Sequence, residues 1–145
     1  MRAESVTIDT EDFMRGLDAD MDRFLREMST AMAQSGNAMA AYARDLAPKD
    51  TGHLSRMITH REGAAGLVFY TEVGTNLEYG PYAEYGTGDT AMYARSNVYH
   101  GHVAPVTYTA GWPGMRGTPH LRPALYDLYP MFLDNMRAAA RRSLS

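Results

Sequence analysis

The residues that could do chemistry are a few histidines and two glutamates in the second half of the chain. His100, His102 and His120 form the best metal candidate, but no Asp or Glu lies between Thr90 and Tyr126 to complete the ligand set. Glu78 and Glu84 are six residues apart, with no partnered His or Lys nearby to make an acid/base pair. The sequence also lacks the motifs of serine hydrolases, phosphate-binding loops, zinc proteases and calcium loops. We therefore expect neither an enzyme nor a bound cofactor or metal.

The composition is that of an ordinary folded domain. The chain has 145 residues, of which 45% are hydrophobic and 21% charged, so we expect one domain over residues 1–145. The absence of cysteine excludes disulfides, thiolate-bound zinc and a cysteine nucleophile. The longest apolar stretch, residues 63–70, is too short to span a bilayer, and the N-terminal residues do not resemble a signal peptide. These features predict a protein made in the cytoplasm without a membrane partner.

Charge is distributed unevenly along the chain. Residues 1–30 carry eight acids and four arginines, whereas the C-terminus ends on Arg137, Arg141 and Arg142. This polarity suits head-to-tail association of copies, in which acidic and basic surfaces meet. Alternatively, the acids lie on a solvated helix face and the arginines lie at a helix C-terminus, where the helix dipole favours cations. The basic residues are too sparse, and the pI near 5.9 too low, for a dedicated nucleic-acid binder. A cytoplasmic nucleic-acid-binding module is nevertheless the main alternative function, and a small hydrolase the weakest.

The first expected element is a long amphipathic helix. Asp9 or Thr10 can cap it, and the residue before Pro48 is pushed out of helical geometry, which ends it. The segment 35–37, Ser-Gly-Asn, predicts a kink or a split. The apolar stripe is expected to pack on the protein's own sheet, with a partner-binding groove as the alternative. Its members recur at gaps of three, four and seven: Phe13, Leu17, Met21, Phe24, Leu25, Met28, Met32, Met39, Tyr42 and Leu46.

The middle and end of the chain predict strands and a second helix. Strands are expected at 54–61 and 66–75, joined by a loop at 62–66, with the second strand central in the sheet. A Gly/Tyr-rich loop at about 89–118 is expected to contain a strand near 103–109. A helix follows to about Arg142, broken near Tyr129 by Pro130. Its inner stripe is expected to be Leu125, Leu128, Phe132, Met136 and Ala140. The fold class is α+β, with a long N-terminal helix on a small antiparallel sheet.

Three motifs, taken in order behind the long helix, resemble a known family. Residues 47–54 (Ala-Pro-Lys-Asp-Thr-Gly-His-Leu), 82–88 (Tyr-Ala-Glu-Tyr-Gly-Thr-Gly) and 118–125 (Thr-Pro-His-Leu-Arg-Pro-Ala-Leu) are similar to signatures of the phage neck and tail-completion family of long-tailed bacteriophages. Tyr85, Thr118 and His120 depart from its usual residues. The motif positions are Pro48, Asp50, Thr51, Gly52, Leu54, Tyr82, Glu84, Gly86, Thr87, Pro119, Leu121, Arg122, Pro123 and Ala124. Independently of the family, Pro48, Gly52 and Pro123 are interpreted as turn-forming residues.

The resemblance implies a structural virion protein of the neck or upper tail. It would form a ring, with six copies expected, that joins head and tail and surrounds the DNA channel. Its partners would be copies of itself and adjacent rings: a connector or stopper, a tail terminator or a tube protein. A lining of Arg95, Arg116 or Arg141 could contact DNA phosphates without reading sequence. Assembly would begin in the host cytoplasm and end in the virion.

Aromatic residues in the second half predict contacts between subunits. Tyr79, Tyr82 and Tyr85 offer large contact areas with polar tips. Glu84 is expected to pair with Arg122 or Arg95, within or between subunits. Trp112 is expected to anchor the 89–118 segment on a neighbour, or alternatively to cap the protein's own core.

Overall fold

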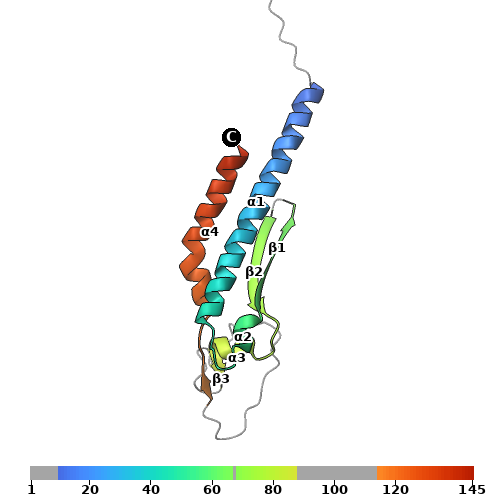
Figure 1. Cartoon of the computed structure of the whole chain (residues 1–145). Coiled ribbons are helices and arrows are strands. Elements are labelled where there is room, and N and C mark those ends of the chain that lie inside the picture. Colours follow the sequence, from blue (N-terminus) through green and yellow to red (C-terminus); the bar gives the residue numbers. More distant parts are fainter. Residues whose placement is uncertain (1–9, 67, 88–113) are drawn as a thin grey trace, which may run out of the picture.

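One helix, α1 (Thr10–Leu46), runs the length of the molecule, and the other large elements pack along it (Figure 1). The computed structural model describes residues 10–66, 68–87 and 114–145. Glu11 and Asp12 lie in the first turn of α1 and Arg44 in the last, where each charge complements the helix dipole. Its buried residues are methionines and alanines, such as Met32, Met39 and Ala40, together with Ser35 and Gly36.

A hairpin covers one side of α1. Strands β1 (Ile58–Ala65) and β2 (Val68–Thr75) pair antiparallel, from Ile58 opposite Thr75 to Ala65 opposite Val68. The predicted loop at 62–66 is therefore wrong, because only residues 66 and 67 join the strands. Gly66 has a φ of 61°, a left-handed conformation that lets a short connection reverse the chain.

The predicted start of the first strand is also wrong, because a short helix, α2 (His53–Arg56), takes its place. Gly52 has a φ of 66° and turns the chain into α2. The Ser55 hydroxyl donates to the Arg44 carbonyl (3.0 Å), and Arg44 Nε donates to the Ile58 carbonyl (2.9 Å). These bonds hold α2 and the start of β1 against the end of α1, with the Leu54 side chain buried between them.

Strand β2 is not central, because in the described part of the chain it pairs with β1 alone. Its inner face packs on α1, where the Phe69 ring meets the Phe24 ring edge-on at 6.2 Å. Val68, on the other face, is 66% exposed. The apolar character of both faces, which predicted a covered strand, instead marks an outer face that this chain leaves open.

The other side of α1 is covered by α4 (Leu121–Ser143), which runs antiparallel to it (Figure 1). Asn135 Nδ2 donates to the Ser35 hydroxyl (3.0 Å), the Tyr42 hydroxyl donates to Asp127 (3.1 Å), and Arg142 Nε pairs with Glu27 (2.8 Å). The small residues Ala124, Ala139 and Ser143 are buried in this contact. The predicted inner position of Leu125 is wrong, since its side chain is 51% exposed.

The predicted break at Pro130 is wrong, because α4 is a single helix from Leu121 to Ser143. Pro130 lies on the exposed side. There the carbonyl that loses its amide partner can turn towards water, while contacts with α1 hold the turns on both sides.

The predicted kink in α1 at residues 35–37 is wrong as well, and the reason is packing. Ser35 is buried and bonds α4, while Gly36 is buried beneath the hairpin. A Cβ at position 36 would overlap the Thr71 hydroxyl and lie 2.9 Å from His60 Cδ2. The break in the apolar pattern therefore marks the point where both neighbours approach α1 most closely.

Short elements complete the end of the molecule opposite the N-terminus of α1. They are α3 (Gly80–Tyr85), β3 (Gly86–Thr87) and β4 (Met115–Arg116), with β3 and β4 paired antiparallel. The order of helices and strands confirms the α+β class. The strand predicted near 103–109 lies outside the described residues.

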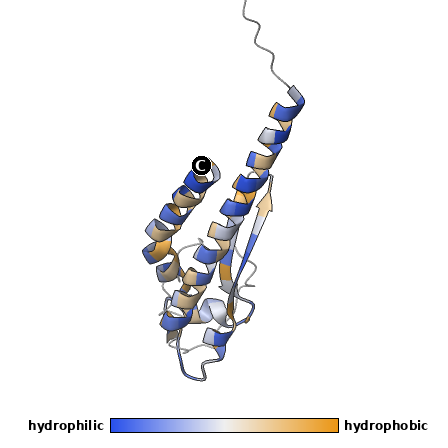
Figure 2. Cartoon of the chain, turned by 45° about the horizontal axis from the view of Figure 1, so that its top comes forward, coloured by the Kyte–Doolittle hydropathy of each residue, from blue (hydrophilic) through white to orange (hydrophobic). Residues whose placement is uncertain are grey.

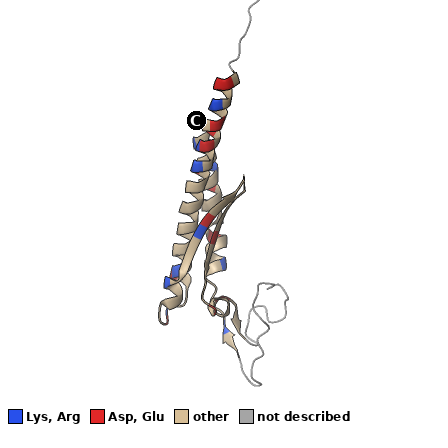
Figure 3. Cartoon of the chain, turned by 90° about the vertical axis from the view of Figure 1, so that its right-hand side faces the viewer, with Lys and Arg blue, Asp and Glu red and all other residues tan. Residues whose placement is uncertain are grey.

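At the other end, α1 extends beyond everything that covers it. All residues from Thr10 to Asp22, here called the arm, are exposed. Figure 2 shows hydrophobic and hydrophilic residues alternating along the arm, and Figure 3 shows acidic residues gathered there. The apolar stripe of α1 is therefore covered by its own chain from Phe24 onwards, while Leu17 and Met21 only border a groove beside Ser143–Ser145. Phe13 is 59% exposed and Leu17 48% exposed.

Replacing Gly36 by Ala should destabilise the protein although Ala favours helix by about 1 kcal/mol. The added methyl must displace Thr71 and the His60 ring, and overpacking of this kind costs about 1–3 kcal/mol. Urea unfolding should show a lower free energy for Gly36→Ala. The control is Gly16→Ala in the arm, where a Cβ meets nothing within 4 Å, so its stability should rise or stay level. Equal gains in both variants would contradict the close packing at Gly36.

Candidate functional site

The three sequence motifs meet at the end of the molecule formed by α2, α3 and the start of α4. A groove there is lined by Pro48, Asp50, Thr51 and Leu54 of the first motif, by Ala83 of the second and by Thr118 of the third. Tyr79, Met115 and Arg116 also contribute to its walls. Segments that are up to 70 residues apart in sequence thus form one surface.

The first motif ends α1 and reverses the chain. The Ala47 amide donates to the Ala43 carbonyl (2.9 Å), and Ala47 is buried in the core with Ile58 and Ala124. The Thr51 hydroxyl then accepts from the His53 amide (3.3 Å), and Gly52 adopts its left-handed conformation. The interpretation of Gly52 as a turn residue is confirmed.

The second and third motifs are locked together through their backbones. Gly86 has a φ of 84°, and a Cβ on Gly117 would lie 2.5 Å from the Tyr85 carbonyl carbon. The Thr118 amide donates to the Ala83 carbonyl (2.7 Å), next to the β3–β4 pair. Only glycine allows two strands of backbone to approach this closely.

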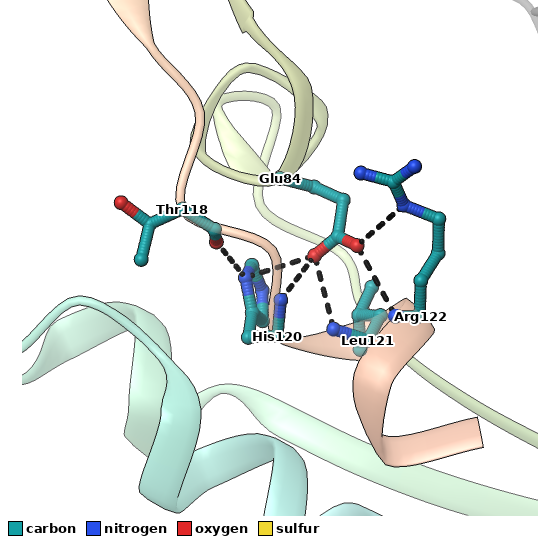
Figure 4. A network of polar contacts seen from close by, with 5 residues as sticks. All are labelled: Glu84, Thr118, His120, Leu121 and Arg122. Carbon is teal, nitrogen blue, oxygen red and sulfur yellow. Dashed lines mark hydrogen bonds and ion pairs between the residues drawn. The ribbon is translucent and has the colours of Figure 1, made fainter. Parts of the chain in front are cut away.

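Glu84 is the centre of this site (Figure 4). Its carboxylate is 2% exposed. Oε2 accepts hydrogen bonds from the amides of His120 (2.7 Å) and Leu121 (2.9 Å). Oε1 accepts from the amide of Arg122 (3.1 Å) and from its Nε (3.1 Å). The carboxylate therefore occupies the N-terminus of α4, where unpaired amides and the helix dipole favour an anion.

The environment of Glu84 keeps it ionised. Burial by itself would raise the pKa of this carboxyl, but the three backbone amides and the Arg122 guanidinium outweigh burial and lower the pKa below its ordinary value. The Arg122 guanidinium also lies over the Tyr85 ring, 4.7 Å from its centroid. The predicted pairing of Glu84 with Arg122 is present, and it joins two parts of the same chain.

His120, a candidate metal ligand and a departure from the third motif in the sequence, is a core residue. It is fully buried, and Nδ1 lies 3.0 Å from both the Thr118 carbonyl and Glu84 Oε2. Because both neighbours accept hydrogen bonds, Nδ1 carries the hydrogen. Among described residues Nε2 has no hydrogen-bond partner. A histidine directly after a Gly-Thr-Pro segment carries no distinctive sequence signal that it helps to seat a helix.

The remaining predicted site residues are scattered. Tyr79 is 43% exposed beside the groove, while Tyr82 and Tyr85 are half-buried. Arg116 is exposed in β4 and Arg141 is exposed near the far end of α4, so the helix separates them by about 30 Å. Arg95, Trp112, His100 and His102 lie outside the described residues.

Glu78 and Glu84 lie in different environments. Glu84 is occupied by α4, and Glu78 is exposed, so they do not form an acid/base pair. The described residues contain no group of three or more His, Asp or Glu side chains placed to hold a metal ion. Within the same residues, no helix is long and apolar enough to cross a membrane.

Comparison with known proteins identifies a matching family. The model of a family described as "Bacteriophage HK97-gp10, putative tail-component" matches residues 11–86, just over half of the chain. The match runs from the first turn of α1 to Gly86 and so includes the first motif and most of the second. No match was found among curated proteins or among solved structures.

Replacing Glu84 by Gln should lower the free energy of unfolding at pH 7 by about 2–4 kcal/mol, because an amide NH₂ would face donors in a buried site. The folded-state pKa of Glu84 lies below its unfolded value, so its stabilisation is complete above the unfolded pKa and is lost as pH falls through the folded one. Urea unfolding at pH 7 and at acidic pH should therefore show the difference shrinking with acidity.

Glu72→Gln provides the matched control, because Glu72 also pairs with an arginine, Arg61, but on the exposed surface. Its stability should change only marginally at either pH. A Glu84→Gln loss no larger than that of Glu72→Gln would contradict the role of Glu84 in seating α4.

Proposed function

The chain belongs to the HK97-gp10-like family of bacteriophage tail components, and from this premise we propose that it is a ring-forming subunit of the neck or upper tail. The ring joins head and tail and surrounds the channel through which DNA passes. Membership of a tail-component family accounts for a virion location and favours a structural over a catalytic role.

The observation that carries the ring is the uncovered apolar surface. Phe13, Met14, Leu17 and Met21 of the arm and Val68 of the hairpin are each about half exposed or more. Exposed apolar surface of this kind can mark a contact with another molecule. When the surfaces in contact are different patches of identical subunits, the assembly either closes into a ring or grows into a filament. A structure at a junction of fixed size requires closure.

We propose six copies and contacts with the rings above and below: a connector or stopper on one side, a terminator or tube protein on the other. Tyr79 and the groove of the three motifs lie at one end of the subunit and the arm lies at the other. The two ends therefore offer different surfaces, which suits a protein placed between two unlike partners.

Contact with DNA would be electrostatic and independent of sequence. Arg116 and Arg141 are exposed, but they lie at opposite ends of α4. If both line the channel, they meet phosphates at two separate places, and neither can replace the other. A formal net charge of −3 limits the channel lining to these local positive positions.

A phage with a nonsense codon in this gene should produce DNA-filled heads and separate tails, because the proposed ring is needed to join them. Supplying the full chain from a plasmid should restore joined, infectious particles, as counted by plaque assay and electron microscopy. A virion map should place several copies of the chain around the channel axis. Joined particles without the protein, or a single copy off the axis, would refute the proposal.

A further inference from the structure

The arm carries an apolar stripe that its own chain leaves about half exposed, with Leu17 and Met21 bordering a groove beside Ser143–Ser145. Phe13, Leu17 and Met21 are spaced by four residues, so they lie on one side of the helix over about 12 Å. Met32 and Met39 continue the same side of α1 into the body of the molecule. Ala19 lies between Leu17 and Met21 but points to the opposite side, as its position in the helical repeat requires.

An apolar trough, of about 420 Å³, runs beside the buried part of that stripe. Its floor is Met32 and Met39 of α1, one wall is Phe69 and Val73 of β2, and the other is the part of α4 from Leu121 to Phe132. That stretch of α4 is about 16 Å long. Leu125 and Tyr129 stand half exposed on the α4 wall. The trough is therefore long enough for three successive side chains of an amphipathic helix.

The arm cannot fill the trough of its own subunit. Arm and floor belong to one uninterrupted helix, α1, so Leu17 stays about 20 Å or more from Met32 along the axis in every copy. An occupant must come from another molecule or from residues outside the described ranges.

Charge favours a second copy as that occupant. The arm carries five carboxylates and one arginine. Helix α4 as a whole carries four arginines and two aspartates, and three of those arginines, Arg137, Arg141 and Arg142, lie beyond the trough towards the C-terminal end of the helix. The subunit already uses such a contact within itself, where Arg142 of α4 pairs with Glu27 of α1. An acidic helix laid along α4 of a neighbour would extend this pattern.

We propose that the arm of one subunit docks in the trough of the next, with Phe13, Leu17 and Met21 facing the α4 wall. This contact rests on the self-association proposed above and specifies its surfaces. It also explains why a 37-residue helix extends past all of its own covering elements.

Cysteine cross-linking tests the contact directly, because the natural chain contains no cysteine. Full-length Leu17→Cys and Leu125→Cys proteins are mixed and treated with a short bis-maleimide. The mixture should give a cross-linked dimer in several-fold higher yield than a mixture of Ala19→Cys with Leu125→Cys. Equal yields in the two mixtures would overturn the contact. A separate variant that combines Leu125→Cys with Trp112→Cys tests the protein's own segment as the occupant. A cross-link within one chain of that variant would also overturn the contact between subunits.

A charge in the stripe provides a second measurement. Leu17→Glu should weaken self-association by tenfold or more in sedimentation velocity, whereas Ala19→Glu should change it less than twofold. The melting temperature of the dilute protein should be unchanged in both, since both positions are exposed. Full-length protein that sediments as a monomer up to millimolar concentration would overturn the proposal.

The outcome separates this contact from the proposed function. The doubly substituted chain, Leu17→Cys with Leu125→Cys, should form a ladder that ends at a closed ring. A ladder that stops at the dimer supports arm docking but contradicts the ring. Rings in the phage neck without any arm–trough cross-link leave the proposed function intact and overturn this inference.

Discussion

The bond between the Glu84 carboxylate and the start of α4 holds the domain together. Three amides at the beginning of α4 lose water on folding, and one buried side chain from α3 accepts from all of them. That contact sets where α4 begins and hence which residues it presents to α1. Since α4 covers one side of α1 and forms a wall of the trough, the proposed docking surface also depends on this buried carboxylate.

The sequence predicted the elements well where a pattern had a single physical cause. The periodic stripe identified α1, and two strand-like segments joined by a short glycine-containing stretch located the hairpin, although not the bounds of its turn. It failed where tertiary packing overrode a local preference. Gly36 and Pro130 both weaken isolated helices. Glycine is required at position 36 because the hairpin packs closely there, and Pro130 is tolerated because it lies on the solvated face of α4. Helix propensities summed along the chain carry no information about which residues, such as Thr71, or which helices, such as α1, lie next to these positions in the fold.

The candidate site shows the same division. The pairing of Glu84 with Arg122 was predicted from the sequence, where both residues belong to the family motifs and the segment from Thr90 to Tyr126 offers arginines but no acids. Its larger role, as the cap of α4, was not, because the cap lies 36 residues before the amides it serves. His120 was misjudged for a related reason. A histidine near glycines resembles a surface residue until the chain on either side is seen to close over it.

The β3–β4 pair has a consequence for how this protein can vary. Thr87 and Met115 lie opposite each other in the ladder, and Thr87 Oγ1 accepts from the Met115 amide at 2.9 Å. The body therefore joins the two ends of the intervening stretch whatever that stretch contains. Closing a loop twice as long costs only about 0.6 kcal/mol more, so the length of this stretch has little effect on the free energy of folding. Related phages could exchange this stretch to suit different neighbours, and an affinity tag inserted there would leave the packing of α1 and α4 untouched.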